Sequence, residues 1–201
     1  PEEIVARLHA DLVGNSKLNG KRILISAGPT QEPIDPVRYI GNRSSGKMGF
    51  ALAEEAAQRG AYVELVTGPV ALTTTVTGIT RTDVVTAAEM AEACRRISPE
   101  CEAVIMAAAV ADFRPSNASG EKIKKKNAIL EISLESTEDI LAWMGSNKPK
   151  HQKLIGFALE TNNALANAQE KLERKNLDLI VLNSLKDEGA GFGHDTNKVT
   201  M

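Results

Sequence analysis

The sequence predicts an α/β fold: a Rossmann-like, doubly wound and mainly parallel sheet with an antiparallel insertion. From Lys21 onward, short apolar runs alternate with amphipathic stretches, which is the pattern of parallel strands joined by helices. The first apolar run, RILISA, ends in the turn residues Gly28, Pro29 and Thr30. After Asp112 a loop rich in Pro, Ser, Asn and Gly breaks this rhythm, and an alternating apolar stretch follows. This interruption indicates an antiparallel insertion.

The predicted strands are short apolar runs, and the predicted helices are amphipathic stretches between them. We expect strands at residues 22–27, 62–67, 80–85, 103–111, 129–134, 153–159 and 178–183, and helices at residues 47–59, 87–97 and 163–175, with a short helix after Thr137. Thr86 and Glu89 form a capping box, so the start of the 87–97 helix is the best-defined boundary. A further strand is expected to begin near Lys198, just before the sequence stops.

The length of 201 residues suits one sizeable hydrophobic core, and a second full domain would be unusual in a chain of this size. Residues 1–18 have a helix-like pattern, which we interpret as a linker or the tail of a preceding domain. Residues 19–201 form the predicted main domain. Because the sequence stops as a strand begins, we expect the extreme C-terminus of that domain to be missing.

The composition is that of a globular protein, with 42% apolar and 25% charged residues. The aromatic content of 3% and the net charge of −2 argue against a nucleic-acid-binding or membrane-surface role. No apolar run approaches the ~18 residues of a membrane span, and no signal peptide opens the sequence. The cytoplasm is therefore the expected compartment.

The cysteines and histidines do not form a metal-binding pattern. Cys94 and Cys101 lack C-x-x-C spacing, and we interpret them as two reduced, buried thiols. His9, His151 and His194 are scattered along the chain, so no metal site can be assigned from them.

The segment GNRSSGKMGF, residues 41–50, resembles a phosphate-binding Walker loop but breaks its rule. Gly41, Gly46 and Lys47 fit the G-x-x-x-x-G-K pattern, whereas Met48 replaces the hydroxyl that holds Mg²⁺. A thioether is a poor ligand for this hard cation, so a kinase or NTPase mechanism is not expected. Two interpretations remain. The segment either caps a helix through Ser44 or Ser45, or it binds a phosphate or carboxylate at a helix N-terminus.

Ligands of doubly wound sheets bind at the carboxyl ends of the strands, so we expect Gly28, Asp112 and Glu160 on one rim. Asp112 follows the small residues of the 103–111 run, and it is either a turn residue or a hydrogen-bond partner of a base or ribose. Asn42 carries an amide that can both donate to and accept from a reacting carbonyl. Phe157 is more simply a core residue than a base-stacking ring.

Two groups of lysines are candidates for binding phosphates. In an extended segment Lys122 and Lys124 point to the same face, and Lys125 points to the other. They form either a solvated hairpin or a triphosphate site. Lys171 and Lys175 lie four residues apart on a predicted helix, where ordinary surface pairing with glutamates is the simpler interpretation. From the residues alone, the chain is interpreted as a nucleotide-binding α/β domain.

Several blocks of the sequence resemble the phosphopantothenate–cysteine ligase family. They are ISAGPTQEPIDPVRYIGNRSSGKMGF, AAAVADFRP, EKIKKK, IGFALETN and KNLDLIVLN, and they occur in the family's order and at similar spacing from Ile25 to Asn183. The N-terminal PEEIVARLHADL is similar to the joint that follows a flavin-dependent decarboxylase in bifunctional bacterial members.

The resemblance implies a ligase that makes 4′-phosphopantothenoylcysteine from 4′-phosphopantothenate and L-cysteine in coenzyme A biosynthesis. Bacterial members similar to this chain use CTP with Mg²⁺, form an acyl-cytidylate and release pyrophosphate and CMP, whereas eukaryotic relatives prefer ATP. The metal is held mainly through the triphosphate. The resemblance also implies a homodimer with a shared site, in which the insertion completes the neighbouring site, and a decarboxylase domain fused N-terminally.

The motifs carry family roles onto individual residues. Asn42 and Lys122 match the catalytic residues, Asn42 for conversion of the acyl-nucleotide and Lys122 for its formation. The nucleotide-binding set is Gly28, Met106, Ala107, Ala108, Asp112, Lys122, Glu138, Asp139, Ile140, Leu141, Phe157, Lys171 and Lys175. The substrate phosphate and pantothenate set is Asn42, Arg43, Ser44, Ser45, Gly46 and Lys47. The sequence departs from the family at Ser136–Ile140, where relatives often have Asn-Pro-Asp-Ile, which weakens the match of residues 138–141.

Two other functions compete with the ligase. The first is an NAD(P)-dependent reductase, but no G-x-G-x-x-G follows the first strand and neither Tyr39 nor Tyr62 is followed four residues later by Lys. The second is a non-catalytic nucleotide-binding or dimerisation module.

Overall fold

The computed structural model describes residues 17–125, 129–160, 163–184 and 199–201. Within them, one sheet has seven strands in the order β11-β10-β9-β6-β1-β4-β5. These strands are β1 (Arg22–Ala27), β4 (Tyr62–Thr67), β5 (Ile79–Asp83), β6 (Ala103–Met106), β9 (Lys153–Glu160), β10 (Leu179–Ser184) and β11 (Val199–Thr200). Neighbouring strands of the sheet run parallel, except that β11 is antiparallel to β10.

The strand order β5-β4-β1-β6-β9-β10 is that of a doubly wound sheet, so the predicted fold class is confirmed. The direction of winding reverses between β1 and β6. In such sheets the crevice at the carboxyl ends of these two strands is the usual ligand site. The topology therefore directs attention to the loops that follow β1 and β6.

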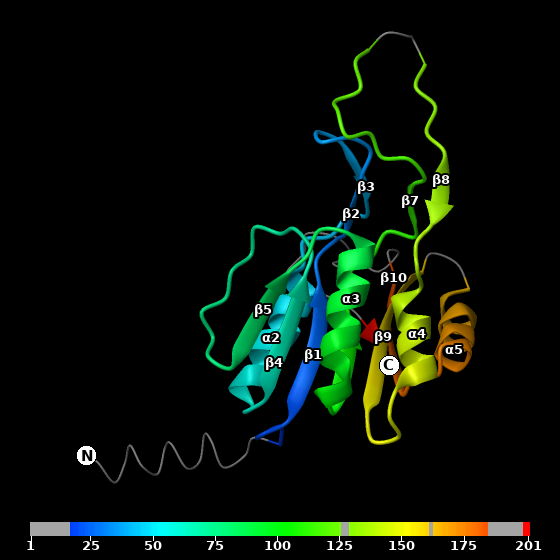
Figure 1. Ribbon diagram of the computed structural model, residues 1–201. Helices are drawn as coiled ribbons and strands as arrows, with labels where there is room; N and C mark the ends of the chain where they lie inside the picture. The colour runs from blue at the N-terminus through cyan, green and yellow to red at the C-terminus, as the bar shows by residue number, and fades with distance from the viewer. Residues whose placement is uncertain (1–16, 126–128, 161–162, 185–198) are drawn as a thin grey trace.

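The helices cover both faces of the sheet unequally (Figure 1). The helix α2 (Lys47–Gln58) packs on one face, against apolar residues of β1 and β4. The helices α3 (Ala87–Ile97), α4 (Ile140–Asn147) and α5 (Ala164–Arg174) pack on the other face, and the 3₁₀ turn η1 (Ser98–Glu100) follows α3. Successive β1 residues serve the two cores in turn, because side chains alternate across a strand.

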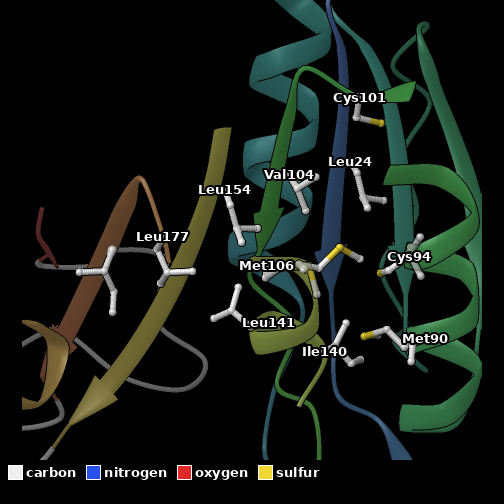
Figure 2. Packing of buried hydrophobic residues seen from close by; sticks show 14 of the residues in the cluster. Leu24, Met90, Cys94, Cys101, Val104, Met106, Ile140, Leu141, Leu154 and Leu177 are labelled. Atoms are coloured by element: carbon white, nitrogen blue, oxygen red, sulfur yellow. The ribbon is translucent and has the colours of Figure 1, made fainter. Parts of the chain in front are cut away.

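The two cysteines belong to the core beneath α3 (Figure 2). Both are free and buried, as predicted from their spacing. Burial raises the pKa of the Cys94 thiol to about 12 and that of Cys101 to about 11. Both thiols are therefore protonated packing groups at neutral pH.

The strand β6 is shorter than predicted. Residues 103–111 were expected to form one strand, but β6 ends at Met106. Beyond it, the chain bonds to the turn after β1: the Ala109 N–H donates to the Gly28 carbonyl, and the Thr30 N–H donates to the Ala109 carbonyl. These two bonds form an isolated parallel bridge between Pro29 and Ala109, and Asp112 lies six residues beyond β6 rather than at a strand end.

The insertion is present, but its strand lies elsewhere. The predicted strand 129–134 is wrong, because residues 129–133 have no regular structure and β8 (Leu134–Ser136) pairs antiparallel with β7 (Phe113–Pro115). The alternation of apolar and polar residues at 129–134 suggested a strand, but such a pattern does not show which strand it would pair with. The insertion projects beyond the carboxyl edge of the sheet (Figure 1).

Beside the insertion stands a hairpin of β2 (Gln31–Pro33) and β3 (Tyr39–Gly41) that the sequence patterns missed. The prolines at positions 33 and 36 concealed these two short strands. Among the other predicted elements, α3 has the expected bounds and capping box, and α4 and β11 are present. The strand β5 ends two residues earlier than predicted. Residues 1–16, which include most of the predicted linker, lie outside the described residues.

Candidate functional site

The start of α2 lies against the carboxyl end of β1. Gly46 is the N-cap of α2 with a left-handed φ of 79°, and a Cβ on it would lie 3.5 Å from the Cα of Gly28. Gly49 meets Ala27 even more closely, since an added Cβ would lie 2.5 Å from the Ala27 Cβ. These separated glycines achieve the close packing of strand, turn and helix that a G-x-G-x-x-G motif gives in one stretch.

Gly46 is the N-cap residue of α2, so the expectation that Ser44 or Ser45 occupies the N-cap position is wrong. No side chain of the N-cap residue bonds to the first turn of α2, and that turn holds no acidic residue. Ser44 Oγ accepts from the Gly46 N–H at 3.3 Å, and Ser45 Oγ accepts from the N–H of Lys47, the first residue of α2, at 3.5 Å. Arg43, Ser45 and Lys47 are exposed around this helix start. The arrangement is suited to a phosphate.

Asn42 joins this segment to the chain beyond β6. Its Nδ2 donates to the Val110 carbonyl at 2.8 Å, although the two residues are far apart in sequence. The segment that receives Asn42 is itself anchored, because the Ala108 N–H donates to Ser26 Oγ and the Ala111 N–H to Thr30 Oγ1. Asn42 remains exposed, which leaves its amide oxygen and second N–H available to a ligand.

Asp112 and the residues before α4 form the next part of the rim. The Asp112 carbonyl accepts from the Thr137 N–H at 2.9 Å, while the Asp112 side chain is exposed. Of the predicted nucleotide-binding residues that follow, Ile140 and Leu141 are buried in the core. Met106, Ile140 and Leu141 can therefore meet a ligand only through backbone groups.

The charged side chains near α4 and α5 hold one another. Lys175 Nζ lies 2.7 Å from Asp139 Oδ2, and Asp139 also accepts from the Ala142 N–H as the N-cap of α4. Burial opposes ionisation of Asp139, but the bonds from Lys175 and Ala142 keep the pKa of its carboxyl below the usual value. Glu138 is paired with Arg95. A nucleotide phosphate that reaches Lys175 would have to compete with Asp139.

Lys171 and Phe157 are also in contact. Lys171 Nζ donates to the Phe157 carbonyl at 2.8 Å, and the Phe157 ring is half-buried on β9. Lys171 lies in α5 and Lys175 is its C-cap residue. The same helix thus brings one lysine to β9 and the other to the start of α4. Lys122 and Lys124 are exposed on the insertion, between β7 and β8 in the chain.

Asp35 and Arg38, which no motif in the sequence marked as site residues, hold the lysine-rich segment. Asp35 is 4% exposed, and its Oδ2 accepts from the Ile123 N–H at 3.1 Å. Arg38 pairs with Asp35 and donates to the Ile123 carbonyl at 2.8 Å. Arg38 and the N–H groups of Val37 and Ile123 lower the pKa of Asp35 well below its usual range. The sequence pair Asp35-Pro36 could have indicated this turn, because an aspartate side chain often bonds to the backbone two residues later.

The described residues contain no group of three or more His, Cys, Asp or Glu side chains that is arranged to hold a metal ion. A cavity of about 400 Å³ opens at the other end of the strands, lined in part by Gly20, Tyr62 and Thr80. Arg22 and Glu64 also line this cavity and form an ion pair at 2.9 Å. The sequence motifs converge at the carboxyl ends of β1 and β6. This rim, rather than the cavity at the other end of the strands, is therefore the candidate site.

The sequence that forms this rim matches a known protein family. Residues 18–201 match the family model of the DNA/pantothenate metabolism flavoprotein C-terminal domain. The chain belongs to this family. The match includes the sheet, the helices and the insertion.

Two curated relatives match this chain along its whole length. The chain is 54% identical over 205 residues to a protein of an unknown prokaryotic organism named cysteine/cysteine sulfinic acid decarboxylase, and it covers 57% of that protein. It is 47% identical over 203 residues to the coenzyme A biosynthesis bifunctional protein CoaBC of Bacillus subtilis (strain 168), and covers 50% of it. The chain thus spans about half the length of these curated relatives.

A solved structure shares both sequence and fold with this family member. The crystal structure of the C-terminal domain of the coenzyme A biosynthesis bifunctional protein CoaBC is 47% identical, with a TM-score of 0.74. The similarity covers 84% of this chain and 79% of that one. The family resemblance predicted from the sequence blocks is confirmed. Within the described residues, no helix is both long enough and apolar enough to span a membrane.

The close contact of α2 with β1 leads to a stability prediction. Replacing Gly49 by Ala should lower the free energy of unfolding by about 1–3 kcal/mol, because the new Cβ overlaps Ala27 and pushes the helix from the strand. Gly120→Ala is the matched control, since a Cβ there meets nothing within 4 Å. Urea denaturation measures both. Equal stability of the two variants would contradict the close approach.

Proposed function

We propose that this chain is a ligase domain that joins 4′-phosphopantothenate to L-cysteine in coenzyme A biosynthesis. The observation that carries the proposal is the hydrogen bond from Asn42 Nδ2 to the Val110 carbonyl, at 2.8 Å. The bond occurs in a fold that this chain shares with the 47% identical CoaBC domain. This bond sets a side-chain amide between an anion-binding helix start and the crevice at the switch point. A phosphorylated acid held at α2 would reach a nucleotide in that crevice.

The proposed reaction has two steps. In the first, the substrate carboxylate attacks the α-phosphorus of CTP, an acyl–oxygen–phosphorus bond forms and pyrophosphate leaves. In the second, the amine of cysteine attacks the acyl carbon, an amide bond forms, the amine loses a proton and CMP leaves. Lys122 offsets the negative charge that gathers in the first step. Asn42, already oriented by Val110, binds the acyl carbonyl in the second step.

The ligand contacts follow from this assignment. The substrate phosphate binds at the start of α2, with Arg43 to Lys47 around it. The nucleotide binds along Gly28, the backbone of Met106 to Ala108, Asp112 and the backbone before α4, with Phe157, Lys171 and Lys175 at its far side. Mg²⁺ binds together with the triphosphate, because this cation usually keeps phosphate oxygens and water as ligands. CTP is the proposed nucleotide, and ATP is the alternative.

The wider context of the domain is also proposed. A chain that spans 50% of a bifunctional relative is suited to fusion with a flavin-dependent decarboxylase domain, which would precede residues 1–18. Its proposed substrates are water-soluble, so we place the enzyme in the cytoplasm. Sequencing of the complete gene tests the fusion, and fractionation of cells tests the location.

Replacing Lys122 with Gln tests the first step. Without the ammonium group, pyrophosphate release from CTP that depends on 4′-phosphopantothenate should slow by about 100-fold or more. Lys125→Gln, on the same exposed segment, is the control for loss of one positive charge. Phosphate assays and mass spectrometry of the intermediate measure the step.

Three results of these assays would count against the assignments. Equal rates for the two lysine variants would remove the role of Lys122. The absence of substrate-dependent pyrophosphate release by the unaltered protein would refute the ligase and favour a non-catalytic module. Hydride transfer with NADPH, or CO₂ release from cysteine sulfinic acid, would point instead to a reductase or to the activity named for the 54% identical relative.

Replacing Asn42 with Asp tests the second step. The carboxylate cannot donate to Val110 and brings negative charge to the acyl group, so acyl-cytidylate should still form but fail to react with cysteine. Asn117→Asp, at an exposed position of the insertion, controls for the added charge. Quenched-flow separation of intermediate and product distinguishes the steps. A normal yield of product from the Asn42 variant would refute this role.

We also propose that two copies of the chain share their sites through the insertion and the β2–β3 hairpin. Apolar side chains are exposed on both, including Val37, Tyr39, Phe113, Leu130 and, at 76% exposure, Ile129. Covering these groups is favourable in a dimer interface. Lys122 lies on the same insertion, so a partner's insertion would carry it to a neighbouring crevice.

Sedimentation velocity should therefore find a dimer. Mixing the Lys122→Gln and Asn42→Asp variants should restore activity that neither has alone, because a mixed dimer contains one site with both native side chains. A monomer would refute the dimer. A dimer with no restored activity would show that each site uses its own Lys122.

A further inference from the structure

The β2–β3 turn is organised by one buried carboxylate whose two oxygens have different partners. Oδ1 of Asp35 accepts from the N–H groups of Val37 and Arg38, at 2.8 and 2.9 Å, and so closes the turn. Oδ2 faces outward from the turn. It accepts from the Ile123 N–H and from Arg38 Nε at 3.1 and 3.0 Å. The turn and the insertion are thus joined by a single side chain.

Both backbone polar groups of Ile123 are bound by this hairpin. Its N–H donates to Asp35, and its carbonyl accepts from Arg38 Nη2 at 2.8 Å. A third bond, from the Ser119 N–H to the Ile34 carbonyl at 2.9 Å, holds the same segment four residues earlier. Residues 122–125 belong to no helix or strand. Their position therefore depends on contacts with the hairpin rather than on regular structure.

The strength of this attachment follows from its charge. A carboxylate that accepts a backbone N–H makes a stronger hydrogen bond than a neutral acceptor, and the guanidinium of Arg38 keeps Asp35 ionised. Lys122 is the residue directly before the held peptide, so the direction in which its side chain leaves the backbone is set by the Asp35–Ile123 bond. A displacement of about 1 Å in such a group is enough to cost about 100-fold in rate.

From this geometry we infer that Asp35, with Arg38, is a positioning residue for Lys122: it holds the Ile123 peptide so that the lysine meets the reacting phosphates. Asp35 does not touch the substrate. This inference rests on the proposed function, because it requires that Lys122 acts in acyl-nucleotide formation. It assigns the β2–β3 hairpin the task of holding the insertion, and with it Lys122, in a fixed position relative to its own protomer.

Asp35→Asn is the variant of choice, because it separates the two halves of the carboxylate. The amide oxygen can still accept from Val37 and Arg38 and keep the turn, since Asn also favours this geometry. The amide nitrogen replaces Oδ2, and it cannot accept from Ile123. Glu135→Gln is the matched control, since it removes the ion pair with Arg114 in the same insertion without touching Ile123.

The kinetic test uses the partial reaction and a double variant. Asp35→Asn should slow substrate-dependent pyrophosphate release from CTP by about 10- to 100-fold, with KM for CTP changed much less than kcat. Combined with Lys122→Gln, it should cause little further loss, because a residue that acts through Lys122 has no effect once that ammonium is gone. Multiplicative losses in the double variant, or a loss equal to that of Glu135→Gln, would overturn the inference.

Hydrogen exchange tests the contact without any need for activity. The Ile123 amide should exchange faster in Asp35→Asn than in the unaltered protein and in Glu135→Gln. Unchanged protection would overturn the inference, even in an active ligase. If Asp35→Asn does not fold, Arg38→Lys, which loses the forked contact to Asp35 and Ile123, serves in both experiments with the same expectations. An inactive unaltered protein with the expected exchange would refute the proposed function while leaving the positioning contact intact.

Discussion

The close approach of backbone segments at the carboxyl end of β1 is the constraint on which the rest of the site depends. Gly28 follows the strand with a φ of 70°, and a Cβ on Gly68 would lie 1.6 Å from the Pro29 carbonyl oxygen. A larger residue at Gly68 would separate the ends of β1 and β4. Because the segments meet without side chains between them, the first turn of α2 lies directly at the switch point of the sheet.

Buried hydroxyl groups extend this contact to the chain beyond β6. Ser26 and Thr30 are fully buried, and each accepts from a backbone N–H of the segment that follows Met106. A buried hydroxyl without a partner would be costly, so both bonds hold the segment in place. The same segment receives Asn42. The start of α2 and the crevice are thus parts of one hydrogen-bonded unit.

Charged side chains of the rim have structural partners before any ligand binds. Lys175 bonds to Asp139, Glu138 to Arg95, and Asp35 to Arg38. Such pairs fix the starts of α4 and of the lysine-rich segment, which favours a preorganised site. A nucleotide at the proposed site would bind beside these pairs or exchange with them, so its binding free energy would include the loss of existing ion pairs.

The sequence by itself determined the alternation of strands and helices, the capping box of α3 and the family, because these depend on local periodicity and on motifs. It supplied the candidate site residues, whose roles stay predictions, but it placed Asp112 at a strand end and a strand at residues 129–134. Only the tertiary structure decided where β6 ends, which strand β8 pairs with, and that Asp35 binds Ile123. These features depend on hydrogen bonds between segments far apart in the chain, and a partner at that distance leaves no local pattern in either segment.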